Sequence, residues 1–429
     1  MILKNSYLGL IVFLLPLSFI IGTAVTETFL FLSILLFIFI NREKNFYIDI
    51  KIIFLFVFAL YVALNSYFLI TDQYGKDLKL SSYLYFRFIL FSLSIFFLCT
   101  CLDQGKHKVF HMLFSFVISV LLFDAIFQFF YGINILGFVV DTSGRVSSFF
   151  QDELILGSFL VKLLPIFMWS LFFFKINLKN NFLLLIIFFS LYFISIYISG
   201  GRTSFFLLLF LIFSFLILIK NIRLILSYSL LILIIFAICI KFFNLGSVDT
   251  SHRIFTKTFE QMTEFNSVTE NSDKDKMKSI ELLKGIRIFS DDHEGHIKLA
   301  LKLFSENKIF GIGPKGFRHY CRQVNYDPDY GICSTHPHNT IIQIISELGL
   351  VGLIFYFFAL TFILFHLLNL VRKNFFNDDC LAFYSITLGL LVNLFPFIPS
   401  GNFFNNWISI VLYYNFGIYL FSYKKCILK

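Results

Sequence analysis

The sequence has 429 residues, of which 58% are hydrophobic and only 14% are charged. Soluble globular domains carry about 25% charged residues, so this composition excludes an ordinary soluble enzyme. The formal net charge is +9, but the basic residues are spread between apolar runs and form no single patch that would suit a nucleic acid. We therefore expect a protein surrounded by membrane lipids, with no nucleic acid partner.

Apolar stretches follow one another along the chain, each with about the 20 apolar residues needed to cross a bilayer as a helix. Helices are expected because lipid cannot satisfy backbone polar groups and the alternating pattern of barrel strands is missing. No small-residue cleavage site follows the first stretch, so we interpret it as a retained helix and not as a signal peptide. The predicted spans are residues 6–22, 24–40, 52–70, 82–100, 109–130, 154–174, 182–198, 203–219, 224–243, 349–370, 381–398 and 405–422.

The positions of Lys and Arg predict the orientation of these spans. With the N-terminus inside, the inner connections hold fifteen basic residues, whereas the short outer connections hold four. We therefore predict an all-α integral membrane protein with about twelve transmembrane helices, both termini in the cytoplasm, and one large outer loop between helices nine and ten. The predicted parts are helices one to nine (1–243), the loop with amphipathic helices (244–348) and helices ten to twelve (349–429).

Two cysteines, Cys321 and Cys333, stand together in the long loop. An exported compartment favours oxidation, and two cysteines have only one connectivity. We therefore predict a Cys321–Cys333 disulfide, with two unlinked thiols as the alternative. The other five cysteines fall in the spans or on the inner side: Cys99, Cys101, Cys239, Cys380 and Cys426.

Charged residues in and near the spans gather toward the outer face. Charge inside a bilayer is costly and usually faces the bundle interior or a water-filled cavity. As a group, these residues predict a polar cavity that opens outward. The alternative is that they pair only to lock helices together, for example Arg87 with Asp124. The group comprises Arg87, Asp124, Arg145, Glu153, Lys162 and Arg202.

A short polar turn, Ser199-Gly-Gly-Arg-Thr-Ser204, separates two apolar runs. Glycine lets a bulky anion approach the backbone, and the guanidinium of Arg202 matches phosphate oxygens. This pattern favours a phosphate-binding turn, although an arginine that extends to lipid headgroups is the alternative. A second segment, Gly144-Arg145 to Phe150, carries a weaker version of the same signal.

The end of the long loop has the strongest local pattern. An amphipathic stretch from His296 to Phe304 precedes the glycine-rich segment Lys308–Phe317, and then comes Cys333-Ser-Thr-His-Pro-His-Asn339. His338 and Asn339 stand where a helix enters the membrane surface, and histidine can act as a base near neutral pH. That helix carries Glu347 and is followed by Gly349-x-x-Gly352.

At these residues the sequence resembles the O-antigen ligase and polymerase family of bacterial envelope proteins. The family shows His-Asn, nine residues and Gly-x-x-Gly, which here are His338-Asn339, the nine residues 340–348, and Gly349 to Gly352. The segment from Asn307 to Pro314 and the Gly201-Arg202 turn also match. The resemblance covers roughly residues 140–370. One departure is His296, where many relatives have an arginine.

The resemblance implies an inner-membrane glycosyltransferase that moves a glycan from a polyprenyl (undecaprenyl) diphosphate carrier to a hydroxyl of lipid A core or another saccharide at the periplasmic face. His338 is implied as the catalytic base and Arg202 as the catalytic group that holds the leaving diphosphate. His336 is the rival base, and the spacing to the glycines selects His338. The implied substrate-binding residues are Arg145, Arg87, Arg318, His336, Asn339 and Lys315.

We predict no metal and no cofactor. Two Asp-x-Asp pairs, at 273–275 and 327–329, and a zinc set of His319, Cys333, His336 and His338 are the alternatives, but their spacing fits no defined metal module. The family resemblance also implies metal-independent transfer.

Other function classes remain open from the sequence. A polymerase of the same superfamily has the same motifs. A polytopic transporter would explain the spans, but it would be expected to show internal repeats and helices broken near the midplane, and the sequence shows neither. A structural envelope protein would explain the loop but not the concentration of Arg and His.

Overall fold

The computed structural model describes residue 15 and residues 18–40, 50–69, 76–101, 108–263, 291–323, 333–372 and 377–427. Within these ranges the chain forms helices joined by turns, and its extended pairings are isolated β-bridges. The predicted all-α class is therefore confirmed for the described part of the chain. The first predicted span, 6–22, lies mostly outside the described residues.

Apolar helices make up the bundle. Six helical segments are long and apolar enough to cross a membrane by length and composition, and three further apolar helices are shorter. Their positions agree with the predicted spans, although the total of twelve stays a prediction. The helices are α2 (Thr23–Ile40), α3 (Ile50–Leu69), α4 (Lys76–Tyr83), α5 (Phe86–Cys101), α6 (Lys108–Tyr131), α7 (Leu156–Phe173), α8 (Phe182–Ile198), α9 (Arg202–Leu218), α10 (Arg223–Phe243), α14 (Thr340–Arg372), α15 (Asp378–Asn393) and α16 (Asn406–Ile427).

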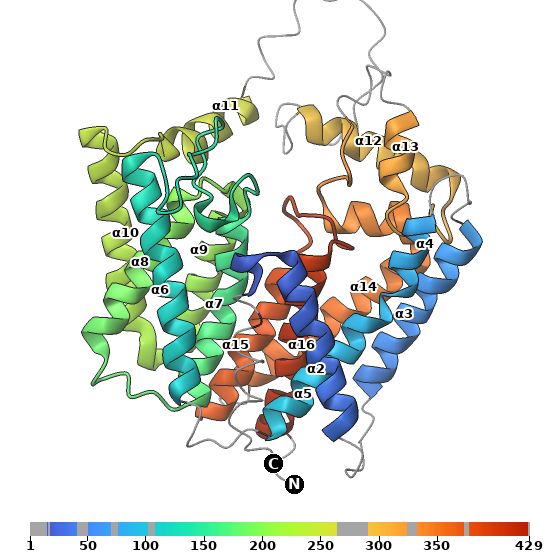
Figure 1. Cartoon of the computed structure of the whole chain (residues 1–429), viewed down its shortest axis with the longest axis horizontal. Coiled ribbons are helices and arrows are strands. Elements are labelled where there is room, and N and C mark those ends of the chain that lie inside the picture. The colour runs from blue at the N-terminus through green and yellow to red at the C-terminus, as the bar shows by residue number, and fades with distance from the viewer. Residues whose placement is uncertain are drawn as a thin grey trace, which may run out of the picture.

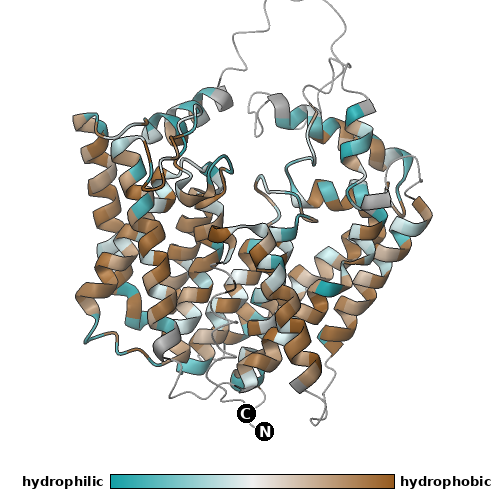
Figure 2. Ribbon diagram, viewed as in Figure 1, coloured by the Kyte–Doolittle hydropathy of each residue, from teal (hydrophilic) through white to brown (hydrophobic). Residues whose placement is uncertain are grey.

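Helix α7 lies at the centre of this arrangement, with nearly all its residues buried. It packs against α15, which packs in turn against α16, and α16 also packs against α5. Helices α6, α8, α9 and α10 lie on one side of this centre, and α2 to α5 and α14 lie on the other (Figure 1). Large apolar side chains of the outer helices, such as Leu224 and Phe242 of α10, are exposed. Figure 2 shows that the helices of the bundle consist largely of hydrophobic residues. Such surfaces suit contact with lipid.

Short helices cover one end of the bundle (Figure 1). They are the π-helix η6 (His252–Thr256), α11 (Lys257–Thr263), α12 (Asp291–Glu306) and α13 (Phe317–Gln323). The amphipathic stretch predicted from His296 to Phe304 lies within α12. Its residues Leu299, Ala300 and Leu303 are buried in a small apolar core of their own, together with Ile312, Phe317 and Cys321. We call the end of the bundle that these short helices cover the site end.

Helix α14 joins the predicted helix that follows Asn339 to the predicted tenth span. It begins at Thr340, nine residues before that span, and it bends at Gly349, whose φ of 65° is left-handed. A Cβ on Gly349 would overlap the carbonyl group of Ile309, and one on Gly311 would lie 2.5 Å from the backbone carbon of Glu347. The glycines of the two sequence motifs therefore form the two sides of one close backbone contact.

The substitution Gly349→Ala is expected to destabilise the protein severely, because the new methyl group meets backbone that cannot rotate away, in addition to the strained φ. Gly137→Ala is the matched control, since Gly137 also has a positive φ of 88° but faces open space. Thermal unfolding of the detergent-purified variants measures the difference. Equal melting temperatures for the two variants would contradict this interpretation of the contact.

Two cysteine pairs are bridged in the structure. Cys321 and Cys333, with Cα atoms 5.4 Å apart, form the disulfide that the sequence predicted. Cys380 and Cys426, with Cα atoms 5.0 Å apart, form a second one. The second pair was not anticipated, because its cysteines are 46 residues apart and meet only when α15 and α16 pack side by side. Among the described cysteines, Cys239 belongs to neither bridge.

Protein purified from membranes under alkylating conditions is expected to show Cys321 and Cys333 protected. The structure supports this because the cysteines bring α13 against the segment that leads to His336, and a loop of this size contributes about 3 kcal/mol by chain entropy. Mass spectrometry of the tryptic peptides, with Cys239 as the internal free-thiol control, measures it. Alkylation of both loop thiols would show that they are unlinked.

Candidate functional site

Three arginines gather where the 132–155 loop, the α8–α9 turn and η6 meet; we call Arg145, Arg202 and Arg253 the arginine cluster. Arg145 donates to the carbonyl oxygens of Leu154 (2.7 Å) and Ser199 (3.4 Å). Arg253 donates to those of Gly200 (3.1 Å) and Ser143 (2.7 Å). Arg202 Nε donates to the carbonyl oxygen of Arg253 (3.2 Å). The turn thus binds the arginines through its backbone.

Gly200 makes this approach possible. Its φ is 66°, and a Cβ there would lie 3.0 Å from Cδ of Arg253 and 3.4 Å from Cγ of Arg145. The sequence analysis predicted that glycine would allow close approach to the backbone, and in the structure the approaching groups are arginine side chains. A larger residue would push the guanidinium groups apart.

The electrostatics of the arginine cluster favour an anion. Burial, together with the charge of Arg253, lowers the pKa of Arg145 to about 10, and burial lowers that of Arg253, with Asp141 acting in the opposite direction. Within the described residues, the side chains of Arg145 and Arg253 hydrogen-bond only carbonyl oxygens, which carry no full negative charge. A bound phosphate group would relieve this like-charge repulsion.

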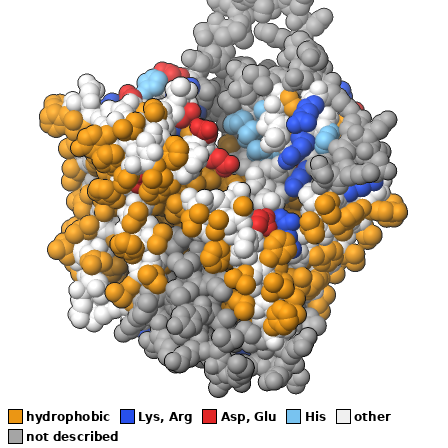
Figure 3. Space-filling view, in the orientation of Figure 1, with side chains coloured by type: hydrophobic (Ala, Val, Ile, Leu, Met, Phe, Trp, Pro, Cys, Tyr) orange, Lys and Arg blue, Asp and Glu red, His pale blue; other side chains and the backbone are white. Residues whose placement is uncertain are grey.

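Four histidines meet elsewhere at the site end, and we call His293, His296, His336 and His338 the histidine cluster. The ring centroid of His338 lies 4.1 Å from that of His336, 4.7 Å from that of His293 and 5.5 Å from that of His296. Helix α12 contributes His293 and His296, and the segment before α14 contributes the other two. Figure 3 shows histidines beside a column of Lys and Arg side chains, across a depression from acidic side chains on the opposite half.

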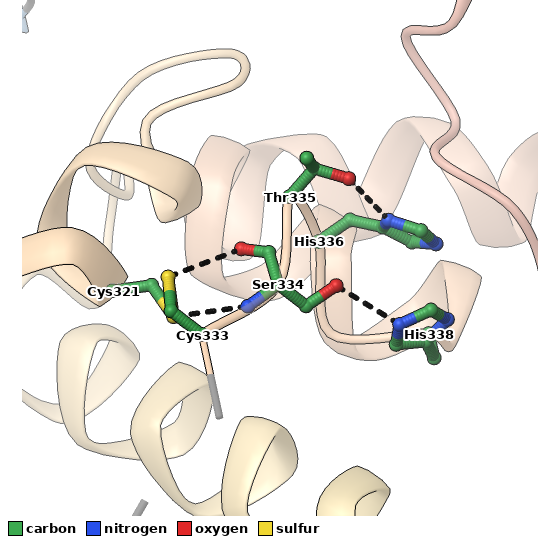
Figure 4. Close-up of a disulfide and its surroundings, with 6 residues drawn as sticks. All are labelled: Cys321, Cys333, Ser334, Thr335, His336 and His338. Atoms are coloured by element: carbon green, nitrogen blue, oxygen red, sulfur yellow. Dashed lines mark hydrogen bonds between the residues drawn. A yellow bond between two sulfur atoms is a disulfide. The ribbon is translucent and has the colours of Figure 1, made fainter. Parts of the chain in front are cut away.

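Hydrogen bonds separate the roles of the two motif histidines (Figure 4). His336 has both ring nitrogens engaged, Nδ1 with Thr335 Oγ1 (3.0 Å) and Nε2 with the carbonyl oxygen of Ser400 (3.1 Å). His338 Nε2 pairs with Ser334 Oγ (2.9 Å), and its Nδ1 makes no hydrogen bond within the described residues. With Nε2–H donating to Ser334, Nδ1 carries the free lone pair that a base needs.

The backbone of His338 is held in a left-handed conformation, with φ of 56°. Such a conformation is costly for a non-glycine residue and persists only where the surroundings impose it. Here the N–H of Ser400 donates to the carbonyl oxygen of His338 (2.8 Å), and Asn339 forms a β-bridge with Pro399. The α15–α16 connection therefore fixes the direction of the His338 side chain.

Ser334 links the Cys321–Cys333 disulfide to His338. The N–H of Ser334 donates to Sγ of Cys321 (3.3 Å), and Oγ of Ser334 bonds His338 (Figure 4).

Asn339 has a capping role: its Oδ1 accepts from the N–H of Ile342 (3.1 Å) at the start of α14, and its Nδ2 donates to the carbonyl oxygen of Pro396 (3.1 Å). Asn339 is thus engaged by the protein.

Lys315 and Arg318 stand beside the histidine cluster. Burial, followed by the charge of Arg318, lowers the pKa of Lys315 to about 8. The charge of Arg318 also contributes to lowering the pKa of His336. Glu347 faces both cations from α14, where its buried carboxylate accepts the N–H of Phe317 (3.2 Å) and Nε2 of Gln343 (3.0 Å). Glu347 therefore holds the segment that carries Lys315 and Arg318.

Arg87 forms an ion pair with Glu27 (2.9 Å) and donates to Oδ1 of Asn406 (3.1 Å). The alternative pairing of Arg87 with Asp124 is therefore wrong. The carboxylate of Asp124 accepts from the hydroxyl of Ser148 and from the N–H of Ile135. The sequence could not separate these possibilities because it gives no distances between spans. The charge of Arg87 also contributes to lowering the pKa of Lys315, so Arg87 lies near this predicted substrate-binding residue.

The candidate site residues thus fall into two groups. Arg145 and Arg202 lie in the arginine cluster, whereas His336, His338, Asn339, Lys315 and Arg318 lie on the other side of the bundle. Arg253, His293 and Gln343 were not predicted. Arg253 lies in no local motif. It joins the cluster only because the segment that follows α10 packs against the α8–α9 turn. The i,i+3 spacing of His293 and His296 was a usable signal, because it places both rings on one helix face.

Histidine protonation gives a testable pH dependence. Burial and the neighbouring histidines lower the pKa of His338 to about 3, and burial lowers that of His336 to about 4. Because an unfolded histidine titrates near 6.5, the folded protein keeps these rings neutral, and their contribution to stability is lost as pH falls below about 6.5. Activity that depends on neutral His338 is expected to change by no more than about twofold between pH 7.5 and 5.5. An acid limb centred near pH 6.5 in kcat/KM would contradict this.

The described residues do not support the two alternative metal sites, the Asp-x-Asp pairs and the zinc set. There, no group of three or more His, Cys, Asp or Glu side chains is arranged to hold a metal ion. The zinc set is incomplete because Cys333 is in a disulfide with Cys321. Both Asp-x-Asp pairs, 273–275 and 327–329, lie outside the described residues.

The described residues thus form a bundle of apolar helices with half-buried cations and a histidine cluster at one end, which indicates a membrane protein. Residues 185–357 match the family described as O-antigen ligase. This match confirms the resemblance seen in the motifs and places residues 185–357 of the chain in the O-antigen ligase superfamily. The match includes Arg202, Arg253 and the histidine cluster, but not Arg145 or Arg87. No curated protein matches the chain.

Proposed function

We propose that this protein transfers a glycan from a polyprenyl diphosphate carrier to an acceptor hydroxyl at the periplasmic face of a bacterial inner membrane. The observation that carries the proposal is the presence of two groups at the site end. One is a strained, neutral His338 with one ring nitrogen that makes no hydrogen bond within the described residues. The other is a half-buried arginine cluster without carboxylate hydrogen bonds to Arg145 or Arg253. A base and a clamp for an anionic leaving group are the two requirements of this reaction.

In the proposed step, the acceptor oxygen attacks the anomeric carbon of the glycan. The new carbon–oxygen bond forms as the bond from that carbon to the phosphate oxygen breaks, and the electron pair leaves with the diphosphate. Nδ1 of His338 takes the acceptor proton. The arginine cluster stabilises the charge that grows on the diphosphate, and arginine suits this because it binds phosphate oxygens bidentately and keeps its charge.

The acceptor side is assigned to the residues around His338. Lys315 and Arg318 lie next to the histidine cluster and can orient an acceptor that carries anionic groups. Asn339 and His336 are engaged by the backbone around 396–400, so we assign them to positioning His338. Both ligation to lipid A core and polymerisation on a second saccharide use this arrangement.

The test is a deletion strain analysed for both substrates. Loss of glycan from the acceptor together with accumulation of the lipid-linked glycan is expected, and the intact gene must reverse both effects. Chemical analysis of the molecule that loses glycan separates ligase from polymerase, because the first loses glycan on lipid A core and the second loses chain length. Unchanged glycan and carrier levels would refute the transferase and favour a transporter.

A further inference from the structure

Lys162 is a cation in the centre of the bundle that the proposed mechanism does not use. It belongs to α7, whose other residues are nearly all buried. Its Nζ lies over the Trp407 ring, 4.9 Å from the ring centroid. Among the described residues, Lys162 has no carboxylate within ion-pair distance. A cation–π contact stabilises the ammonium by less than its removal from water costs.

The position of Lys162 connects the two parts of the candidate site. On one side of α7, Arg145 bonds the carbonyl oxygen of Leu154 just before the helix, and Gly157 is in close contact with Ser199 of the α8–α9 turn. On the other side is Trp407, in the first turn of α16, after the connection that bonds His336 and His338. At 1.5 Å per residue, Lys162 lies about 9 Å along α7 from its start at Leu156.

Carboxylates near this end of the bundle are engaged elsewhere or exposed. Glu27 bonds Arg87, and Asp124 bonds Ser148. Asp152 and Glu153 are exposed to solvent. The described residues therefore supply no counter-charge for the Lys162 ammonium, whereas an intramembrane charge ordinarily has a partner or faces a polar cavity.

We infer that Lys162 is an anion-binding residue between the arginine and histidine clusters, and that its ligand is the phosphate portion of a lipid-linked substrate. This inference rests on the proposed function. A long lysine side chain can extend its ammonium along the helix toward the site end, where the diphosphate lies in the membrane interface. Lys162 adds a mobile point charge to the fixed guanidinium groups of the arginine cluster.

The protein contains a built-in reporter for this binding. It has two tryptophans, and Trp169 lies toward the other end of α7, where its Nε1 donates to Ser422 (2.8 Å). In a Trp169→Phe background, the emission of Trp407 reports on the neighbourhood of Lys162. The probe is polyprenyl diphosphate without glycan, added to the full-length protein in lipid nanodiscs, and polyprenyl alcohol with the same tail is the control for the phosphate.

We expect saturable quenching or enhancement of Trp407 emission by the diphosphate and not by the alcohol. Lys162→Met is expected to weaken binding by about tenfold or more while leaving the melting temperature of the empty protein unchanged or raised, because an unpaired charge is removed. Lys162→Arg is expected to restore part of the affinity. Lys241→Met, which removes an exposed charge at the end of α10, is the matched control and is expected to bind normally.

Three outcomes would contradict the inference, and they do so for different reasons. Unchanged affinity in Lys162→Met, with wild-type protein binding the diphosphate, would overturn the role of Lys162 and leave the proposed function intact. No binding of the diphosphate to wild-type protein would overturn the proposed donor, and the role of Lys162 with it. A fall in both affinity and melting temperature in Lys162→Met, without partial rescue by Lys162→Arg, would show that Lys162 is structural.

Discussion

Replacing His338 with alanine is expected to lower the rate of glycan transfer by about 10²- to 10⁴-fold, the usual contribution of a general base. Donor affinity should change little, because the diphosphate is assigned to the arginine cluster. The loss should therefore be seen in kcat with the KM for the donor nearly unchanged. The measurement uses purified protein with a synthetic lipid-linked donor and acceptor.

His336→Ala is the decisive comparison for this prediction. His336 bonds Thr335 and the carbonyl oxygen of Ser400 through its two nitrogens, so its loss should disturb the position of His338 and give a partial defect accompanied by lower stability. His252→Ala, at an exposed position of η6, should be neutral. If His336→Ala is inactive while His338→Ala is active, the base is misassigned. If both are active, another group activates the acceptor.

Arg202→Lys is expected to lower transfer by about 10²-fold, as for loss of one preorganised donor to developing negative charge. Lysine keeps the charge but offers a compact ammonium in place of the planar fork that matches diphosphate oxygens. The contact of Arg202 Nε with the carbonyl oxygen of Arg253 also orients the guanidinium, and lysine cannot reproduce that geometry. Steady-state rates at saturating and limiting donor give the kcat and KM effects separately.

Arg223→Lys is the matched control for Arg202→Lys. Arg223 also bonds backbone carbonyl oxygens, those of Leu216 and Ile217, but it begins α10, at the opposite end of α9 from Arg202. It should keep nearly full activity. Near wild-type transfer by correctly inserted Arg202→Lys protein would show that Arg202 only anchors the turn at the membrane interface.

The helices were the most predictable part of the fold. Length and hydropathy locate a span directly, which is why the predicted ranges for α8 and α10 agree with the structure within one residue at each end. The segment from Thr340 to Leu348 was predicted as a helix but not as part of the tenth span, because it is amphiphilic: Gln343 and Glu347 are buried polar residues that bond Phe403 and Phe317. Burial of polar side chains by tertiary partners leaves no hydropathy signal.

The candidate site was predictable only as separate pieces. Motif spacing pointed to His338, and a glycine beside an arginine pointed to Arg202. Their partners belong to segments that are distant in the sequence: Arg253 follows α10, Ser400 lies in the α15–α16 connection, and His293 lies in α12. The sequence carries these residue types but not the contacts, so it could not show that both ring nitrogens of His336 are hydrogen-bonded, whereas His338 bonds through Nε2.

The two cysteine pairs lie at opposite ends of the bundle. Cys321 and Cys333 adjoin His338 at the site end, whereas Cys380 and Cys426 join the first turn of α15 to the last turn of α16, away from the connection that bonds His336. The 22 residues of α16 span about 33 Å, close to the thickness of the hydrocarbon core. The protein thus carries one cysteine pair at each end of the bundle, and the oxidation state of each pair in isolated membranes would report the redox compartment that its end occupies.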